Sequence, residues 1–247
     1  MRNLFFFLIL LAIVPAFSQS KPRESLDPTV SEIWDLKPVK VTPGKNPGEA
    51  PSDAIIIFDG KDLSNFSALD GSAAKWDVKD GALTVTKGLG DIKTKKQFGD
   101  IQLHIEWRAP DVIVGEGQGR GNSGIFLQER YELQVLDSYE SVTYSNGQAG
   151  SIYKQSIPLV NATRKPGEWQ VYDVVYNAPV FSENGRVSAP AKITVLHNGV
   201  LIQNGTAIFG PTEYKGLPVY QSHGKASLKL QDHGNPVSFR NIWIREL

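Results

Sequence analysis

The sequence contains no cysteine among its 247 residues. Disulfide bonds, cysteine nucleophiles and cysteine-ligated zinc are therefore excluded, and so is a lipid-anchored cysteine behind a leader peptide. Hydrophobic residues make up 40% of the chain, which is sufficient for a core. An exported form of this protein would depend on that core alone to hold its fold.

The chain also lacks a net charge, because 26 basic residues balance 26 acidic ones. A nucleic-acid partner is not expected, since phosphate neutralisation needs a basic surplus. The sequence has no Gly-Lys-Ser/Thr phosphate loop and no Gly-x-Ser-x-Gly elbow. Phosphate-loop and serine-nucleophile chemistry therefore have little support.

The longest apolar run, residues 4–14, is too short to cross a bilayer, which takes about 20 residues. Arg2 precedes this run, and Ala16-Phe17-Ser18 fits a small-x-small cleavage site. We expect residues 1–18 to be a signal peptide of a bacterial periplasmic or secreted protein. No membrane span is expected after its removal.

Repeated prolines and no helical period characterise residues 19–53, which we expect to be an extended arm. The composition leaves open whether this arm lies along the domain surface. Residues 54–247 instead alternate apolar and polar side chains in short runs separated by turn signals, such as Asp80-Gly81 and Asn198-Gly199. Long helical periods are missing, so the pattern predicts one all-β sandwich or barrel.

The run "DIQLHIEWR" (100–108) alternates cleanly and carries an unusual polar face. His104, Glu106 and Arg108 would follow one another at about 7 Å along the strand. These side chains fit either a catalytic face or an ion-paired surface strip, and such exposed pairs are common and weak.

The run "YELQVLD" (131–137) places Glu132 and Gln134 on the face opposite its apolar side chains. A one-residue bulge at Leu136 would bring Asp137 to the same face. The spacing is similar to the bulged acidic motif of sandwich-fold β-glucanases, but the central carboxylate is replaced by Gln134. The departure weakens the case for a conventional retaining glycosidase, which needs a pair of carboxylates.

Two turn-rich segments carry further polar candidates. In "GRGNSGIF" (119–126), Asn122 and Ser123 suit sugar hydroxyls, although a tight turn explains them equally well. Near the C-terminus, Asp232 and His233 could share a proton or bind a cation, whereas the simpler explanation is a turn capped by Asp232.

Eight motifs follow one another along residues 54–247. They are "IIIFDGKDLSNF", "WDVKDGALTV", "IEWR", "GNSGIFL", "YELQVLD", "KPGEWQVYDVVYNAP", "LHNGVLI" and "LQDHGNPVSFRNIWIREL". Together and in this order they resemble the 3-keto-disaccharide hydrolase family. The resemblance implies a concanavalin A-like β-jelly-roll sandwich of two antiparallel sheets, found in exported bacterial proteins that act on oxidised sugars.

The implied substrate is an oxidised di- or oligosaccharide or glycoside. A ketone at C3 acidifies the C2 proton, so a base can start elimination of the C1 oxygen, and water then adds. Glu132 is our first candidate for this base, with Asp137 and His104 as rivals, and Arg108 and His233 are candidates for polarising the ketone. The candidates for binding sugar hydroxyls are Glu106, Asn122, Ser123, Gln134 and Gln231.

Three other interpretations remain at this point. The chain could be a carbohydrate-binding, lectin-like domain, a laminarinase-like glucanase, or a structural cell-envelope protein with a vestigial pocket. The sequence requires no cofactor, although a divalent cation would stabilise an enolate well. The metal ligands, the sugar linkage and the oligomeric state cannot be read from the sequence.

Overall fold

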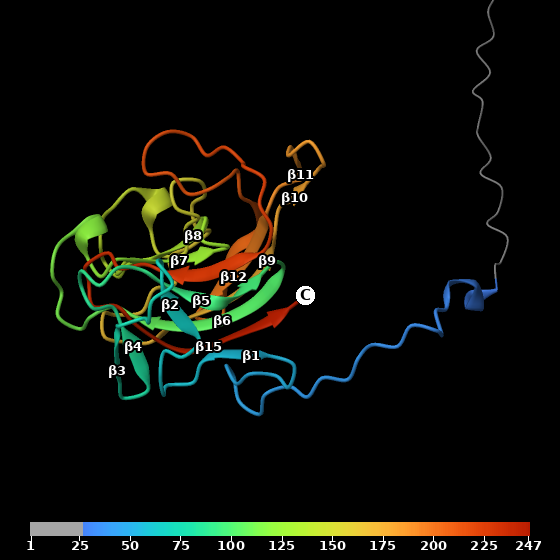
Figure 1. Ribbon diagram of the computed structural model, residues 1–247, viewed down its shortest axis with the longest axis horizontal. Helices are drawn as coiled ribbons and strands as arrows, with labels where there is room; N and C mark the ends of the chain where they lie inside the picture. Colours follow the sequence, from blue (N-terminus) through green and yellow to red (C-terminus); the bar gives the residue numbers. More distant parts are fainter. Residues whose placement is uncertain (1–26) are drawn as a thin grey trace, which may run out of the picture. The chain divides into compact units, whose positions relative to one another are not determined.

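The computed structural model describes residues 27–247, so the predicted signal peptide lies outside the described residues. The chain divides into two compact units, the first ending at Lys40 and the second beginning at Val41. A short 3-10 turn, η1 (Pro28–Ser31), is part of the first unit (Figure 1). Among the described residues, no helix has the length and apolar character to cross a membrane.

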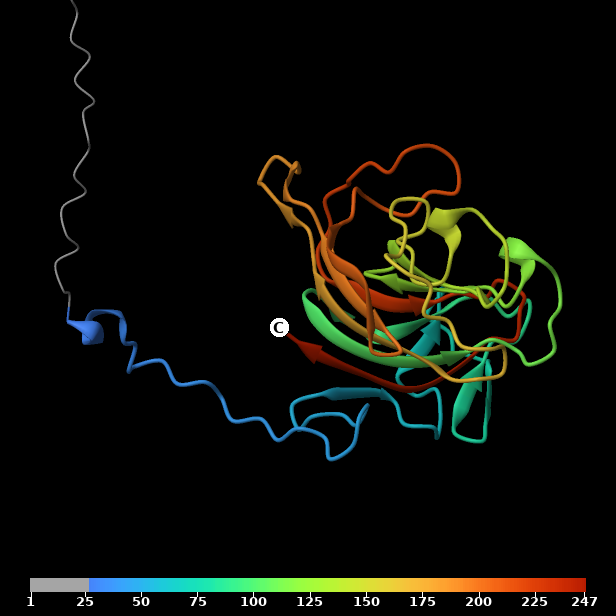
Figure 2. The same cartoon turned by 180° about the vertical axis from the view of Figure 1, so that it is seen from behind.

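One antiparallel sheet of eight strands has the order β13–β12–β9–β6–β15–β4–β3, and β1 also pairs with β15 (Figure 1). In Figure 2 the long strands β6 (green) and β15 (dark red) curve together. The strands are β1 (Ile55–Phe58), β3 (Asp77–Lys79), β4 (Ala82–Thr84), β6 (Ile101–Arg108), β9 (Gln170–Asn177), β12 (Lys192–His197), β13 (Val200–Ala207) and β15 (Ser238–Glu246).

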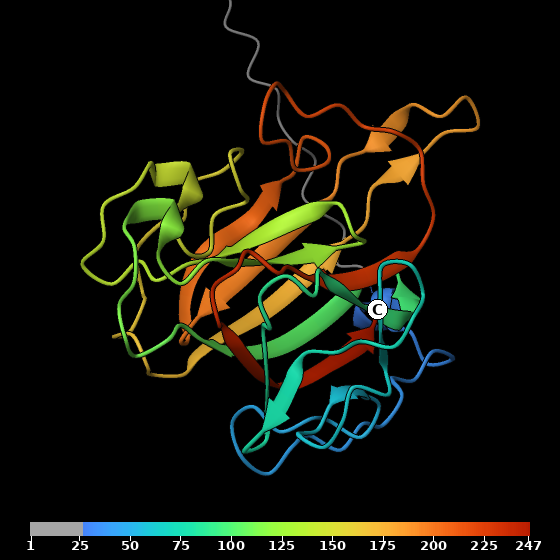
Figure 3. The same ribbon diagram turned by 60° about the vertical axis from the view of Figure 1, so that its left-hand side comes forward.

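A second antiparallel sheet of five strands has the order β2–β5–β14–β7–β8. Its strands are β2 (Phe66–Ala68), β5 (Ile92–Phe98), β7 (Ser123–Leu127), β8 (Tyr131–Val135) and β14 (Ala226–Leu230). A separate hairpin consists of β10 (Val180–Phe181) and β11 (Val187–Ala189). Two 3-10 turns, η2 (Gly117–Gly119) and η3 (Ser145–Gly147), lie in loops beside β7 and β8 (Figure 3).

The core lies between the two large sheets and follows from the two-residue alternation of their strands. On β6, Leu103, Ile105 and Trp107 are fully buried, and on β8 Tyr131 and Leu133 are fully buried as well. Burying one such side chain contributes about 1.5–3 kcal/mol, so these facing stripes hold the sheets together. The predicted all-β sandwich of two antiparallel sheets is confirmed.

Both predicted tight turns are present. Asp80-Gly81 joins β3 to β4 with φ values of 51° and 75°, and Asn198-Gly199 joins β12 to β13 with φ values of 53° and 81°. Two successive positive φ angles define the type I′ turn, which matches the twist of paired strands. The turns therefore fix the register of both hairpins.

Residues 41–53, which the sequence suggested to be part of the arm, belong to the compact second unit. The carbonyl of Gly48 accepts hydrogen bonds from Asn241 Nδ2 at 3.0 Å and from Trp243 Nε1 at 2.9 Å, both on β15. Gly48 has a φ of 82°, and a Cβ there would lie 3.1 Å from the His104 ring. The close approach explains why a glycine stands at this contact.

Candidate active site

The face of the five-stranded sheet that points away from the core carries a cavity of about 810 Å³. Strands β7 and β8 pair so that Phe126 lies opposite Glu132 and Gly124 lies opposite Gln134. Since side chains alternate along a strand, these positions share the face opposite Tyr131 and Leu133. The cavity is lined by Gln118, Gly119, Asn122, Phe126, Glu132, Gln134, Tyr144, Tyr153, Lys154, Thr212, Tyr214, Gln231 and His233.

Glu132 lies on the floor of this cavity and is 4% exposed. Burial raises the pKa of its carboxyl group to about 8, even though the charge of Lys229 acts in the opposite direction. Gly124 leaves room for the carboxyl group, because a Cβ at that position would lie 2.5 Å from Glu132 Oε1. A carboxyl group with a pKa near neutrality is suited to accept and return a proton.

Lys229 on β14 is the cation whose charge lowers the pKa of Glu132. It stands opposite Phe126 in the β14–β7 register, and its Nζ lies 3.8 Å from the centre of the Phe126 ring. The same Nζ donates to Asp91 Oδ2 at 3.0 Å. The charge of Lys229 is therefore shared with Asp91, which leaves the Glu132 carboxyl without full compensation.

Side-chain amides form the polar wall of the cavity. Gln134 Nε2 donates to Gln118 Oε1 at 3.1 Å and lies 3.4 Å from Asn122 Oδ1. The oxygen of the same amide, Gln134 Oε1, is buried and has no hydrogen-bond partner in the part of the chain that the structure describes. The same is true of Gln231 Oε1. Buried acceptors are nearly always satisfied, so these two oxygens are available to donors from water or from a ligand, such as hydroxyl groups.

The rim of the cavity consists of residues that the sequence patterns did not single out. Tyr144, Tyr153, Lys154 and Tyr214 come from the loops that follow β8 and β13. Lys154 Nζ lies 4.2 Å from the centre of the Tyr214 ring and donates to the Tyr214 carbonyl at 2.7 Å. Loop residues lack the two-residue alternation that identifies the faces of a strand. The tyrosines of "SVTYSNGQAGSIYKQ" (141–155) were the one feature of the sequence that could have indicated this part of the cavity.

One protein-family model, described as the 3-keto-alpha-glucoside-1,2-lyase-like domain, matches residues 53–245. The chain belongs to this family. A 3-keto-disaccharide hydrolase from Bacteroides thetaiotaomicron is 26% identical, with 81% of each sequence covered.

Two solved structures from Parabacteroides distasonis ATCC 8503, both of candidate glycosyl hydrolases, are similar to this chain. The first is 55% identical with a TM-score of 0.87 and covers 92% of this chain and 99% of its own. The second is 21% identical with a TM-score of 0.58 and covers 84% of this chain and 100% of its own, which shows the fold alone. The family match, the Bacteroides thetaiotaomicron relative and the first of these structures support a carbohydrate-active hydrolase.

In this member of the 3-keto-alpha-glucoside-1,2-lyase-like family, five of the residues selected from the sequence line one cavity. They are Asn122, Glu132, Gln134, Gln231 and His233. Ser123 does not join them, because it lies on the core side of β7, where its hydroxyl donates to the Gln231 carbonyl at 2.7 Å. It positions the backbone next to Gln231.

Asp137 is also separated from Glu132. Strand β8 ends at Val135, the β7–β8 pairing has no register shift, and Leu136 is buried in the core, so the predicted bulge is not part of the strand pair. Asp137 lines a second cavity of about 280 Å³, where its Oδ2 accepts from Arg120 Nε at 2.6 Å. The expected pairing of Asp137 with Glu132 in one site is therefore not formed.

The expectation that the polar face of residues 100–108 shares this site is wrong. His104, Glu106 and Arg108 lie on β6 of the eight-stranded sheet and point away from the core, on the side opposite Ile105 and Trp107. Alternation along a strand predicts which side chains share a face. It does not predict which of the two sheets contains the strand, and here the whole core separates β6 from the cavity.

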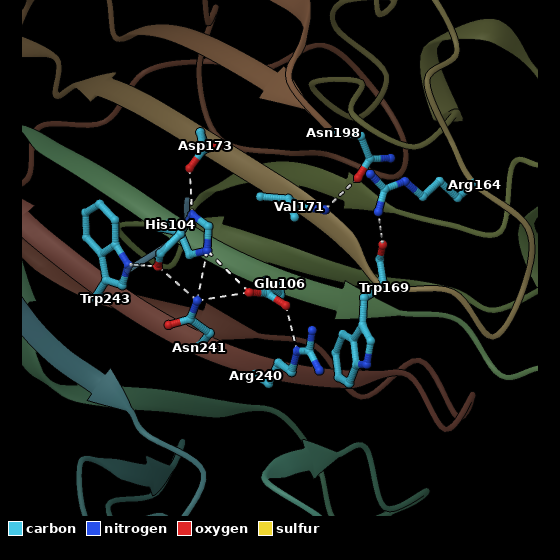
Figure 4. A network of polar contacts seen from close by, with 11 residues as sticks. His104, Glu106, Arg164, Trp169, Val171, Asp173, Asn198, Arg240, Asn241 and Trp243 are labelled. Atoms are coloured by element: carbon cyan, nitrogen blue, oxygen red, sulfur yellow. Dashed lines mark hydrogen bonds and ion pairs between the residues drawn. The ribbon is translucent and has the colours of Figure 1, made fainter. Parts of the chain in front are cut away.

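His104 and Glu106 instead belong to a polar network on the outer face of the eight-stranded sheet (Figure 4). His104 Nδ1 lies 2.6 Å from Asp173 Oδ1, and Asn241 Nδ2 donates to Glu106 Oε1 at 2.9 Å. Burial alone would lower the pKa of His104, but the carboxylates of Asp173 and Glu106 raise it to about 9. Arg240 Nε donates to Glu106 Oε2 at 2.6 Å.

Arg108 is held apart from this hydrogen-bonded network by an aromatic ring. Its guanidinium carbon lies 4.7 Å from the centre of the Trp169 ring, and that of Arg240 lies 4.1 Å from the same ring. Such stacking on an indole is a common structural use of arginine. The ion-paired strip considered for this strand is therefore present in part, with His104 and Glu106 ion-paired and Arg108 stacked on Trp169.

Proposed function

We propose that this protein cleaves 3-keto glycosides by removing the C2 proton and eliminating the C1 oxygen. The observation that carries the proposal is the Glu132 carboxyl group, buried at the floor of a polar cavity with its pKa raised to about 8. The family description and the name of the Bacteroides thetaiotaomicron relative support the substrate class.

The reaction begins when Glu132 takes the proton from C2. The electron pair of that C–H bond forms the enolate of the C3 ketone, and the enolate then expels the glycosidic oxygen from C1. The resulting enone adds water at C1, and protonated Glu132 returns its proton to C2. Glu132 thus acts first as a base and then as an acid, which requires a pKa close to the working pH.

The enolate oxygen needs a donor while its charge develops. His233 and the amide of Asn122 line the same cavity and suit this role, whereas Arg108 lies on the other sheet. The two unpaired amide oxygens, on Gln134 and Gln231, would accept hydrogen bonds from sugar hydroxyls.

The acidic residues favour elimination over the displacement used by laminarinase-like glucanases. Retaining and inverting glycosidases place two carboxylates on opposite sides of the scissile bond. Among the described residues that line the cavity, Glu132 is the one carboxylate, and Asp137 is ion-paired with Arg120 in the second cavity. Elimination next to a ketone needs one carboxylate as the base and does not need a second one.

The same proposal leaves room for a divalent cation, which the sequence alone did not require. Within residues 27–247, no group of three or more His, Cys, Asp and Glu side chains is arranged to hold a metal ion. Assays with and without a chelator would show whether cleavage depends on such an ion.

The test uses a 3-keto glycoside and its unoxidised parent with purified protein and with Glu132→Gln. We expect cleavage of the 3-keto glycoside only, and a loss of at least about 100-fold in kcat/KM for the variant, because the base is removed. Sugar binding without cleavage of either compound would favour a lectin-like domain. Cleavage of the parent would favour a glucanase, and full turnover by Glu132→Gln would exclude Glu132 as the base.

A further inference from the structure

Elimination at C1 also needs a proton donor for the departing oxygen, and the cavity contains a further polar group beside Glu132. This inference rests on the proposed function, because it concerns the second half of the same reaction. The group consists of Tyr144, Tyr153 and Lys154 on the rim of the cavity.

The backbone places Tyr153 next to the candidate base. Residues 150–153 run along the free edge of β8, where the amides of Gly150 and Gln134 donate to the carbonyls of Gln134 and Ser151 at 2.9 and 3.0 Å. The Tyr153 amide donates to the Glu132 carbonyl at 3.2 Å. Tyr153 and Glu132 are therefore neighbours across the edge of the sheet, and both side chains line the cavity.

The two tyrosine hydroxyls are joined to each other. Tyr144 Oη and Tyr153 Oη lie 2.5 Å apart, and Tyr144 is the more exposed of the two. Lys154 Nζ lies 5.8 Å from the centre of each of these rings. Burial raises the pKa of the Tyr153 hydroxyl above its ordinary value, so this hydroxyl keeps its proton at neutral pH.

Lys154 is held in place by its backbone and by its side chain. Its φ is 60°, a conformation that residues other than glycine rarely adopt, and its amide donates to the Asn146 carbonyl at 2.8 Å. Its Nζ donates to the Tyr214 carbonyl at 2.7 Å. The ammonium group therefore stays beside the tyrosine rings, where it favours a negative charge that develops on either hydroxyl.

We propose that Tyr153 is the catalytic acid that protonates the leaving oxygen, with Tyr144 as the link to solvent and Lys154 as the charge that stabilises the tyrosinate. In the first step the C1–O bond breaks, the electron pair goes to the leaving oxygen, and this oxygen takes the Tyr153 proton. In the second step the tyrosinate takes a proton from water while the resulting hydroxide bonds to C1. Glu132 returns its proton to C2, so both groups regain their starting states.

The position of Tyr153 relative to His233 supports this division of roles. Tyr153 lies beyond the edge of β8, whereas His233 follows Gln231, whose amide donates to the Gly124 carbonyl on β7 at 3.0 Å. The two groups therefore approach the Glu132 carboxyl from opposite sides of the strand pair. A base between an acid and an enolate donor is the arrangement that elimination requires.

The test compares Tyr153→Phe with the wild type on a methyl and a 4-nitrophenyl 3-keto glucoside of the same anomer. The 4-nitrophenolate ion is a stable leaving group that departs without protonation, whereas the methoxy oxygen must be protonated and departs as methanol. We expect a loss of about 100- to 1000-fold in kcat for the methyl substrate and less than about 10-fold for the nitrophenyl substrate. An equal loss on both substrates would overturn the role of Tyr153 and leave the proposed function intact.

Further variants separate this role from a structural one. Tyr144→Phe and Lys154→Met should show the same dependence on the leaving group to a smaller extent, and Tyr144→Phe replaces the main variant if Tyr153→Phe does not fold. Tyr139→Phe, a tyrosine outside the lining of this cavity, should leave both rates unchanged. A loss confined to the methyl substrate in His233→Gln but not in Tyr153→Phe would give the role to His233. Inactivity of the wild type on both substrates would overturn this inference together with the proposed function.

Discussion

Two carboxylates of this chain are almost equally buried and yet differ in what they can do. Asp137 is 2% exposed and its charge is matched by Arg120 at 2.6 Å, so it serves as one half of an ion pair. Glu132 is 4% exposed, but Lys229, the cation that lowers its pKa, is shared with Asp91. Burial without full compensation raises the pKa of Glu132, and proton transfer near neutral pH follows from that imbalance.

The pH dependence of kcat/KM should report this carboxyl group. Glu132 acts as a base in the first step, so activity is expected to fall about tenfold per pH unit below an apparent pKa near 8. Lys229→Met removes a charge that lowers the pKa of Glu132, and the acidic limb should therefore move to higher pH. Steady-state rates across pH 5–10 check both points. An acidic limb near pH 4–5, or one that Lys229→Met does not move, would contradict the assignment.

The strands show what a sequence pattern can and cannot predict. Alternation in residues 101–108 and 131–135 correctly separated the side chains that face the core from those on the opposite face of each strand, and the Asp80-Gly81 and Asn198-Gly199 turns join two hairpins. Alternation is a property of one strand, whereas membership of a sheet depends on pairing across the chain. For that reason the sequence suggested that His104 shares a site with Glu132, although the two residues lie on the outer faces of different sheets. The sequence patterns did not predict the tyrosines on the rim of the cavity, because these residues lie in loops, where apolar and polar side chains do not alternate.

The outer network around His104 joins β6, β9 and residues 41–53, and it makes stability depend on pH. The folded-state pKa of His104 is about 9, above its ordinary value, so its stabilising effect is present below about pH 6.5 and lost as pH rises through 9. We expect a contribution of about 1–2 kcal/mol, reduced by solvent because the Asp173 side chain is 48% exposed. The difference in Tm between wild type and His104→Gln should therefore be largest at pH 6 and smallest above pH 9.5.

A matched variant gives the control for this prediction. Asp173→Asn keeps the size of the side chain but removes the carboxylate that lies 2.6 Å from His104 Nδ1. It should lower the pKa of His104 and flatten the same part of the stability profile. A Tm difference that stays constant from pH 6 to 9.5 in both variants would mean that His104 acts only through packing, for instance through its stacking on Trp243.

On the scale of the molecule, the sandwich separates two polar surfaces by one aromatic-rich core. The cavity lies on the five-stranded sheet, and the ion-pair network lies on the eight-stranded sheet. Trp107, Tyr131, Tyr172 and Tyr176 are all fully buried between them, with no cysteine anywhere in the chain. The formation of this fold therefore involves no disulfide bond.

Export itself is a prediction that the sequence makes and that can be measured directly. The apolar run of residues 4–14 and the Ala16-Phe17-Ser18 site predict a mature chain that begins at Gln19 and is found outside the cytoplasm. Leu8→Arg places a charge within the apolar run and should leave uncleaved protein in the cytoplasm, whereas Ser20→Arg, beyond the site, should be exported. Mass spectrometry of cell fractions gives both readings. An intact N-terminus on exported wild-type protein would show instead that the apolar run is retained as an anchor.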